Sequence, residues 1–258
     1  MVNLKKYNVL LQQFVLFLTF AAFLSCSQQK IVVTKIEGKQ ININNSAELT
    51  PSIETFIKPY RENIEKDLSE ILAFAPKNID KTGEWQSSIG NLLADVVIEK
   101  GNPILKLRKN VSIDFCLLNH GGIRAIIPKG NVTAKTAFEI MPFENSLIIV
   151  AMKGSDVLEI PTYIIKEKKP HPLSGMIFTI DKNNLAKNIL IQGKPIDENK
   201  TYYVATSDYL ANGGDNMTFF KKNSDKIDLD YKLRNILIDY FKTVDTIPLV
   251  LDKRIIVE

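Results

Sequence analysis

The stretch Thr201-Tyr-Tyr-Val-Ala-Thr-Ser-Asp-Tyr-Leu-Ala-Asn-Gly-Gly-Asp-Asn216 predicts a strand that runs directly into a glycine loop. Its first half is rich in β-branched and aromatic residues, as paired strands are. Gly213 and Gly214 can adopt positive φ or let another group approach the backbone closely. The loop would hold Tyr209 and Asp215 at the end of a sheet. An aromatic face beside a carboxylate suits a nucleoside, because the base can stack and the ribose hydroxyls can donate hydrogen bonds.

Taken alone, this loop fits a tight loop whose Asp215 caps the following turn as well as it fits a nucleoside site. Two further strings decide between these interpretations. Leu118-Asn-His-Gly-Gly-Ile-Arg124 follows the apolar segment 111–118 and also turns on a glycine pair. Met141-Pro-Phe-Glu-Asn145 lies between the two loops. In this order the strings resemble the 5′-nucleotidase C-terminal domain family, which carries Asn-x-Gly-Gly-x-Arg, then Pro-Phe-x-Asn, then Gly-Gly-Asp after a Tyr-x-Val-Ala strand. The resemblance covers residues 47–258.

The resemblance implies a substrate site built from these strings. Phe143 and Tyr209 match the two aromatics that sandwich the base in the family, where the second is usually Phe. Asp215 matches the carboxylate that accepts the ribose hydroxyls, and Arg124 matches an arginine that holds the phosphate. The remaining matched positions read the base, support the loops or allow close backbone approach: Asn119, Gly121, Gly122, Asn145, Gly213 and Gly214. His120 falls at a variable position of the family and is expected to be structural.

The phosphate side of this site departs from the family pattern. The family supplies a further arginine just before the segment that matches Gly90-Asn-Leu92, but this chain has no arginine between Arg61 and Arg108. Lys81 could compensate only in part, as a point charge. An ammonium lacks the planar fork with which guanidinium binds two phosphate oxygens. The sequence therefore predicts an intact nucleoside site and a weakened phosphate site.

The catalytic centre of the family is not recognisable in this sequence. Two-metal phosphoester hydrolysis needs clustered His, Asp and Asn ligands, whereas the chain has 2 histidines and no Asp-x-His or Gly-His-x-His string. In the family these ligands belong to a separate N-terminal metallophosphoesterase domain. We therefore expect no catalytic residue, metal ligand or cofactor in this chain, with divalent metal ions in a partner chain. The resemblance implies the nucleotide-binding half of a split 5′-nucleotidase-type phosphohydrolase; the alternative is a non-catalytic nucleoside-binding envelope lipoprotein.

The N-terminus resembles an export signal. Residues 1–26 contain Lys5 and Lys6, an apolar run over 14–24 and then Cys26, as in a lipoprotein signal peptide whose cysteine becomes lipidated. Residues 27–46 are polar and are expected to be a tether, so that the domain comprises 47–258. These features predict a lipid-anchored protein of the bacterial cell envelope, and an ordinary signal peptide cut elsewhere is the alternative.

Composition fits this picture and does not support nucleic acid as a partner. The chain is 45% hydrophobic and 24% charged, with a net charge of +4 that falls to +2 once Lys5 and Lys6 are removed. A charge this balanced gives no basis for binding a polyanion. Cys116 lies in an apolar strand and is expected to be a buried, unreactive thiol.

The expected fold class is α+β, a mixed β-sheet with flanking helices, because helices and strands alternate irregularly. The apolar spacing and the stop signals predict elements along the domain. Helices are expected over 51–71 (with Thr50 as N-cap and Pro59 inside), 88–99 (ended by Gly101), 134–140, 154–165 and 229–244. Strands are expected over 111–118, 147–152, 175–181, 186–192, 201–207 and 254–257.

Overall fold

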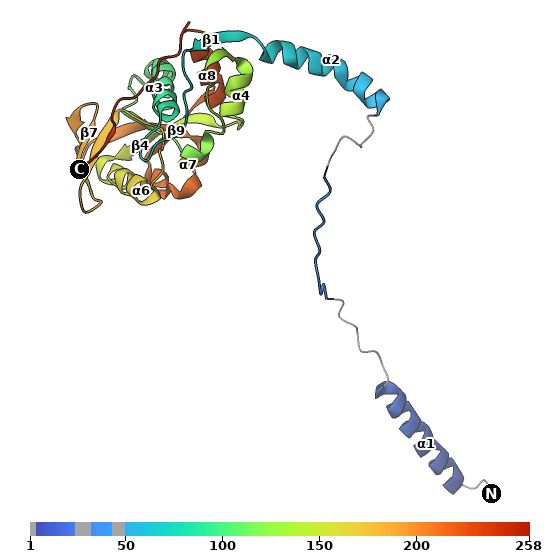
Figure 1. The fold of residues 1–258 in the computed structure, drawn as a ribbon. Coiled ribbons are helices and arrows are strands. Elements are labelled where there is room, and N and C mark those ends of the chain that lie inside the picture. Colours follow the sequence, from blue (N-terminus) through green and yellow to red (C-terminus); the bar gives the residue numbers. More distant parts are fainter. Residues whose placement is uncertain (1–3, 24–31, 43–49) are drawn as a thin grey trace. The chain divides into compact units, whose positions relative to one another are not determined.

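The structure, a computed structural model, describes residues 4–23, 32–42 and 50–258 of the chain (Figure 1). It divides into two compact units, Met1–Pro51 and Ser52–Glu258. The first contains helix α1 (Leu4–Phe23), and the described part of the predicted tether has neither helix nor strand. No helix in these described ranges is long and apolar enough to cross a membrane. Cys26, the predicted site of lipid attachment, lies outside them.

A five-stranded mixed sheet forms the centre of the second unit. Its strands are ordered β10 (Asp225–Lys232), β4 (Ser146–Lys153), β9 (Thr201–Ser207), β2 (Phe115–Leu117) and β5 (Leu173–Ser174). Only the β2–β9 pair is parallel within it. All of β2 and nearly all of β4 are buried, which requires cover on both faces of the sheet. The predicted fold class is confirmed.

Helices cover this sheet on two sides (Figure 1). On one side lie α3 (Ser88–Lys109), α4 (Ala134–Ile140) and α8 (Leu233–Phe241), and α8 contacts both of the others. On the other side lie the shorter helices α5 (Gly154–Val157), α6 (Glu159–Glu167) and α7 (Asp208–Ala211). The predicted helix 154–165 is therefore present as two pieces, with a break at Leu158.

Two smaller sheets complete the unit. A four-stranded sheet has the order β11 (Ile255–Val257), β6 (Met176–Ile180), β7 (Ala186–Ile191) and β8 (Lys194–Pro195). It contains the predicted 175–192 hairpin and the predicted final strand. A two-stranded sheet pairs β1 (Ile71–Ala75) with β3 (Gly130–Thr133). The sequence assigned Ile71 to the preceding helix, and this was wrong because α2 (Pro51–Leu68) ends before it.

The predicted stop of α3 at Gly101 was wrong, since the helix continues to Lys109 through both Gly101 and Pro103. A Cβ at Gly101 would lie 2.9 Å from side-chain atoms of both Ile113 and Leu147. The glycine therefore lets the helix approach the sheet closely, rather than ending it. The helix ends at Asn110, which has the left-handed conformation typical of a C-cap (φ 55°).

The predicted helix 229–244 begins later than expected, because residues 225–232 form strand β10. Leu229 fits the helical spacing of the following apolar residues, which is why the sequence favoured one helix. It fits a strand equally well, since Ile227, Leu229 and Tyr231 alternate with polar residues. Residues 225–228 and 232 pair with β4, and this pairing favours the strand over the helix.

Helix α2 begins at Pro51, as predicted, and contains Pro59. None of its residues is buried. The apolar stripe read from the sequence is present but exposed, with Ile53 56% and Tyr60 62% accessible. Packing of this stripe therefore contributes nothing to the core of the unit.

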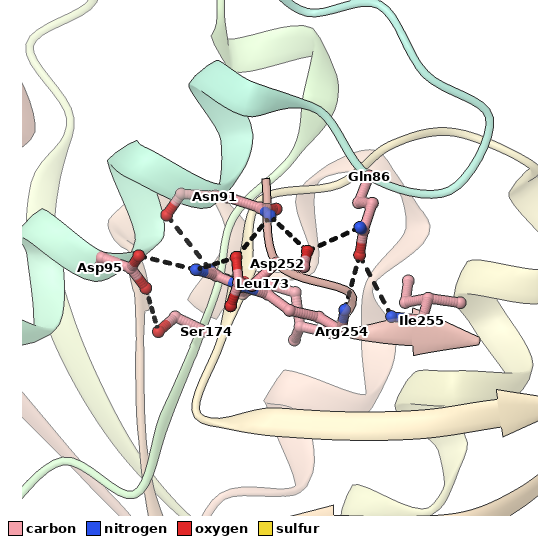
Figure 2. Close-up of polar contacts among 8 residues, drawn as sticks. All are labelled: Gln86, Asn91, Asp95, Leu173, Ser174, Asp252, Arg254 and Ile255. Atoms are coloured by element: carbon pink, nitrogen blue, oxygen red, sulfur yellow. Dashed lines mark hydrogen bonds and ion pairs between the residues drawn. The ribbon is translucent and has the colours of Figure 1, made fainter. Parts of the chain in front are cut away.

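The C-terminal strand is held in place by Arg254, a buried arginine at its start (Figure 2). Its guanidinium donates to Asp95 Oδ2 at 2.7 Å, to both carboxylate oxygens of Asp252 at 3.1 Å, and to the carbonyl oxygens of Asn91 and Leu173. Burial opposes the charge, but the hydrogen bonds to Asp95 and Asp252 raise the pKa of Arg254. One side chain thus ties β11 to helix α3 and strand β5.

Candidate functional site

The three sequence strings meet at one edge of the five-stranded sheet. Strands β2 and β9 are parallel neighbours, with Cys116 opposite Ala205, so their carboxyl ends lie at the same edge. Strand β4 is antiparallel to β9, with Leu147 opposite Ser207. The start of β4 therefore lies at that edge as well. Sheet topology alone brings Asn119–Arg124, Phe143–Asn145 and Tyr209–Asp215 together.

These segments enclose a cavity of about 440 Å³, within the range typical of small-ligand sites. Eight of the ten residues predicted for the site line it: Asn119, Gly121, Gly122, Arg124, Phe143, Asn145, Tyr209 and Asp215. Gly213 and Gly214 do not line it, and Gly214 packs against the Tyr209 ring. Eight of the residues predicted for the site thus line a single cavity.

Two aromatic side chains are exposed within this cavity. Phe143 is 44% and Tyr209 47% accessible, which is costly for aromatic rings unless a ligand covers them. Gly214 explains where the Tyr209 ring lies. A Cβ at Gly214 would come within 2.4 Å of the ring's Cε1 atom, so the ring rests on the glycine backbone. Gly213 supplies the positive φ of 86° with which the loop turns.

Asp215 presents its carboxylate in a fixed orientation. Tyr209 donates its hydroxyl to Oδ1 at 2.9 Å and accepts the backbone N–H of Asp215 at 3.1 Å, and Asn119 donates its amide to Oδ2 at 2.6 Å. Asp215 itself has a left-handed backbone (φ 49°), an unfavourable conformation that neighbouring contacts must maintain. Each carboxylate oxygen keeps acceptor capacity for a further donor.

Arg124 lines the cavity beside Phe143. Its guanidinium donates to the Gly121 carbonyl at 3.1 Å and lies 5.6 Å from the centroid of the Phe143 ring. Gly122 leaves room for the Asn119 side chain, since a Cβ there would be 2.7 Å from Asn119 Oδ1. Of the described residues that line the cavity, Arg124 alone carries a positive charge.

Lys81 contacts the backbone of the same loop. Its ammonium donates to the carbonyl oxygen of Ile123 at 2.8 Å, so it supports the Asn119–Arg124 loop without lining the cavity. Glu84 and Trp85, which stand near the position of the family's further arginine, line a different surface depression with the C-terminal strand. The cavity therefore has one guanidinium with which to bind an anion.

The sequence did not single out Tyr163 as a site residue, and it assigned no role to His171. Tyr163 donates its hydroxyl to the backbone carbonyl of Asp215 at 2.7 Å, and His171 Nδ1 accepts the N–H of His120 at 3.2 Å. Burial lowers the pKa of His171 to about 4 and, with Lys81 nearby, lowers that of His120. Both imidazoles are neutral at pH 7. The signal available in the sequence was the position of His171 between Pro170 and Pro172.

Within the described residues, no three His, Cys, Asp or Glu side chains gather where they could hold a metal ion. Burial strongly raises the pKa of the Cys116 thiol, and the residue is fully enclosed. It therefore offers no nucleophile at neutral pH. The described side chains at the cavity offer a ligand two aromatic faces, one carboxylate and one guanidinium.

Known proteins resemble this chain in sequence and in fold. Protein UshA of Escherichia coli is 27% identical over 139 residues, which are 53% of this chain and 24% of UshA. A 5′-nucleotidase of Vibrio vulnificus is 25% identical over 191 residues, or 70% of this chain and 32% of its own. The crystal structure of a 5′-nucleotidase precursor from Thermus thermophilus superposes with a TM-score of 0.66 at 24% identity, covering 79% of this chain and 42% of that one.

The match is confined to one part of these relatives. The chain spans less than half the length of each of the three. The family described as "5′-nucleotidase, C-terminal domain" matches residues 73–222, a segment that includes all three strings and every residue of the cavity. The chain belongs to the 5′-nucleotidase C-terminal domain family.

Proposed function

We propose that this chain binds a nucleotide or nucleoside in the 440 Å³ cavity and is the binding half of a split 5′-nucleotidase-type phosphohydrolase. A separate metallophosphoesterase chain would supply the metal-dependent hydrolysis. The observation that carries the proposal is the placement of two exposed aromatic rings and one oriented carboxylate around a single cavity. That combination matches the flat apolar base and the vicinal hydroxyls of a ribonucleoside.

The residues of the chain would bind and orient the substrate. Phe143 and Tyr209 contact the faces of the base, with stacking worth about 0.5–1.5 kcal/mol beyond the buried area. Asp215 accepts the ribose hydroxyls and so favours ribose over deoxyribose. Arg124 holds the 5′-phosphate with two parallel hydrogen bonds. Divalent metal ions in the partner chain would activate the water that attacks the phosphorus atom.

The proposed location follows from the N-terminal sequence. We propose export through a signal peptide over residues 1–26 and lipid attachment at Cys26, which anchors the domain on the outer side of a bacterial membrane by a tether over 27–46. A nucleotidase in that place would release nucleosides for uptake. Metabolic labelling with a fatty acid, compared between the wild type and Cys26→Ser, tests the anchor.

Calorimetric titration of residues 27–258 with adenosine and with AMP tests the binding proposal. We expect both ligands to bind, and AMP to bind about tenfold more tightly through a charge-assisted contact with Arg124. Arg124→Gln should remove the preference for AMP. Arg108→Gln, at an exposed ion pair with Asp230, is the matched control and should retain it. Failure of the wild type to bind either ligand would overturn the proposal.

A second candidate function is a nucleoside-binding lipoprotein with no catalytic partner. The observation that favours it is the single guanidinium of the cavity, because Lys81 is directed to the Ile123 carbonyl. A nucleoside binder has no need of a phosphate site. Adenosine binding as tightly as AMP, with no metallophosphoesterase gene beside this one, would favour this alternative. Phosphate release from AMP by a reconstituted pair of chains would exclude it.

A further inference from the structure

We propose that Tyr163 and His171 are positioning residues that join the two glycine loops of the site and hold Asp215 in its ligand-binding orientation. Neither residue lines the nucleotide cavity. Both line a smaller neighbouring cavity of about 220 Å³, which shares Gly121 and Asp215 with the first. The proposal rests on the proposed function, since it assigns these residues to the ribose side of that site.

His171 fixes the first loop. Its side chain is only 3% exposed, and its Nδ1 atom accepts the N–H of His120, in the one-turn helix η1 (His120–Gly122) that follows Asn119. Because Nδ1 accepts, the neutral imidazole carries its proton on Nε2. That N–H is buried with no partner among the described residues. An unpaired donor is costly, so an apolar residue would suit packing alone better than histidine does.

The segment that carries His171 is itself anchored on both sides. Leu118 at the end of strand β2 donates its N–H to the Pro172 carbonyl at 2.9 Å. The first turn of α3 also packs against this segment, where a Cβ at Gly90 would lie 3.5 Å from Pro172 Cα and 3.7 Å from the Pro170 carbonyl oxygen. The backbone that carries the imidazole is therefore held against both β2 and α3.

Tyr163 fixes the second loop. It lies on helix α6 and donates its hydroxyl to the backbone carbonyl of Asp215 at 2.7 Å. Since the backbone of Asp215 is left-handed, at φ 49° and ψ 31°, an external hydrogen bond to its carbonyl helps to maintain that conformation. Burial, with Glu167 nearby, raises the pKa of Tyr163 to about 12. The hydroxyl therefore remains a donor throughout the physiological range.

The two supports are in contact with each other. The rings of Tyr163 and His171 lie 5.5 Å apart between centroids and are tilted by 49°, a favourable arrangement for aromatic pairs. Across the site, Asn119 of the first loop donates to Asp215 of the second. The two loops are thus joined directly by the hydrogen bond between Asn119 and Asp215 at the larger cavity. They are joined indirectly by the ring contact between His171 and Tyr163 at the smaller cavity.

Tyr163→Phe tests the second support, because it removes the hydroxyl and keeps the ring. Calorimetric titration should show adenosine binding weakened about threefold to tenfold, as for a single lost hydrogen bond, with 2′,3′-dideoxyadenosine bound as by the wild type. Tyr231→Phe is the matched control, because Tyr231 donates its hydroxyl to Asp239 outside the nucleotide cavity, and it should change neither affinity. Equal effects of Tyr163→Phe on both ligands, or no effect, would overturn the proposal.

A conservative rescue tests the first support. The amide oxygen of an asparagine can accept the His120 N–H in place of Nδ1, whereas a leucine side chain cannot. We expect His171→Asn to retain adenosine affinity within about twofold and His171→Leu to lose more than about threefold, with thermal unfolding measured for both. Equal affinities of the two variants would contradict the role of His171. A wild type that binds no nucleoside would instead overturn the proposed function, and this inference with it.

Discussion

At the scale of single residues, we propose that Asp215 determines which ligand the site selects. Both of its carboxylate oxygens already accept a hydrogen bond, from Tyr209 and from Asn119. These bonds orient the carboxylate before any ligand arrives and reduce the ordering that binding requires. The hydroxyl that distinguishes Tyr209 from the usual phenylalanine therefore has a partner within the site itself.

Asp215→Ala should weaken ribonucleoside binding by about 1.5–3 kcal/mol, the value of hydrogen bonds to a charged acceptor. The variant should barely change the affinity for a 2′,3′-dideoxy analogue, which has no hydroxyl to donate. Isothermal titration with the two ligands measures the difference. Asp225→Ala serves as the control, because among the described residues that carboxylate accepts a hydrogen bond only from the N–H of Lys226. Equal losses for both ligands would refute the role given to Asp215.

His171 predicts a pH dependence of stability. Burial lowers its folded-state pKa from 6.5 to about 4, so between these values the unfolded chain binds a proton that the folded chain does not. Stability should therefore fall as the pH falls through this window, by about 3 kcal/mol from this group. His120, Glu167, Lys169 and Asp215 surround the imidazole and contribute to its field.

Urea unfolding at pH 7, 5.5 and 4.5 measures this contribution. The loss of unfolding free energy should be smaller in His171→Asn than in the wild type, since asparagine does not titrate and all other groups are common to both. Parallel pH profiles of the two proteins would show that the buried imidazole does not govern acid stability.

Much of the site was predictable at this scale because its residue types and spacings are specific. The family motifs identified Asn119, Arg124, Phe143 and Asp215, and the structure brings them to one cavity. Tyr163 was not predictable, because its contribution is a bond to a backbone carbonyl 52 residues away. No local sequence pattern records such a contact.

At the scale of elements, apolar periodicity found most helices and strands but not their ends. Gly101 resembled a helix stop, and Leu229 fitted the spacing of the next helix. In both cases tertiary contacts decided otherwise. Helix α3 passes close to the side chains of Ile113 and Leu147, and β10 gains a ladder with β4. Neither contact can be predicted from local helix or strand propensity.

Arg254→Met should destabilise the protein by about 3 kcal/mol, because it removes charge-assisted bonds and leaves the carbonyls of Asn91 and Leu173 without this donor. The C-terminal strand β11 should be released first. Urea unfolding and amide hydrogen exchange in 255–257 measure the two effects. Arg108→Met, whose ion pair with Asp230 is exposed, should cost less than about 1 kcal/mol. Similar losses in both variants would contradict the role of the Arg254 network.

At the scale of the whole molecule, function depends on how the sheet orders its strands. The three strings are separated by long intervals in sequence, and the parallel pairing of β2 with β9 brings two of them to one edge. The sequence could not show this pairing, because nothing local in either strand specifies its neighbour. The family resemblance supplied the expectation that the strings converge, and the topology gives the physical reason.

The whole chain should bind nucleotide without hydrolysing it. Phosphoester hydrolysis by this chemistry requires two metal ions about 3.5–4 Å apart, and in the part of the chain that the structure describes no group of three potential ligands is available to hold even one. We expect the purified chain, given AMP and Mn²⁺ or Zn²⁺, to release phosphate no faster than buffer. EDTA should shift neither its thermal unfolding nor its affinity for AMP. Metal-dependent phosphate release that is lost in Asp215→Ala would place a catalytic centre within this chain. Release that appears only on addition of a metallophosphoesterase chain would instead establish the division of labour proposed here.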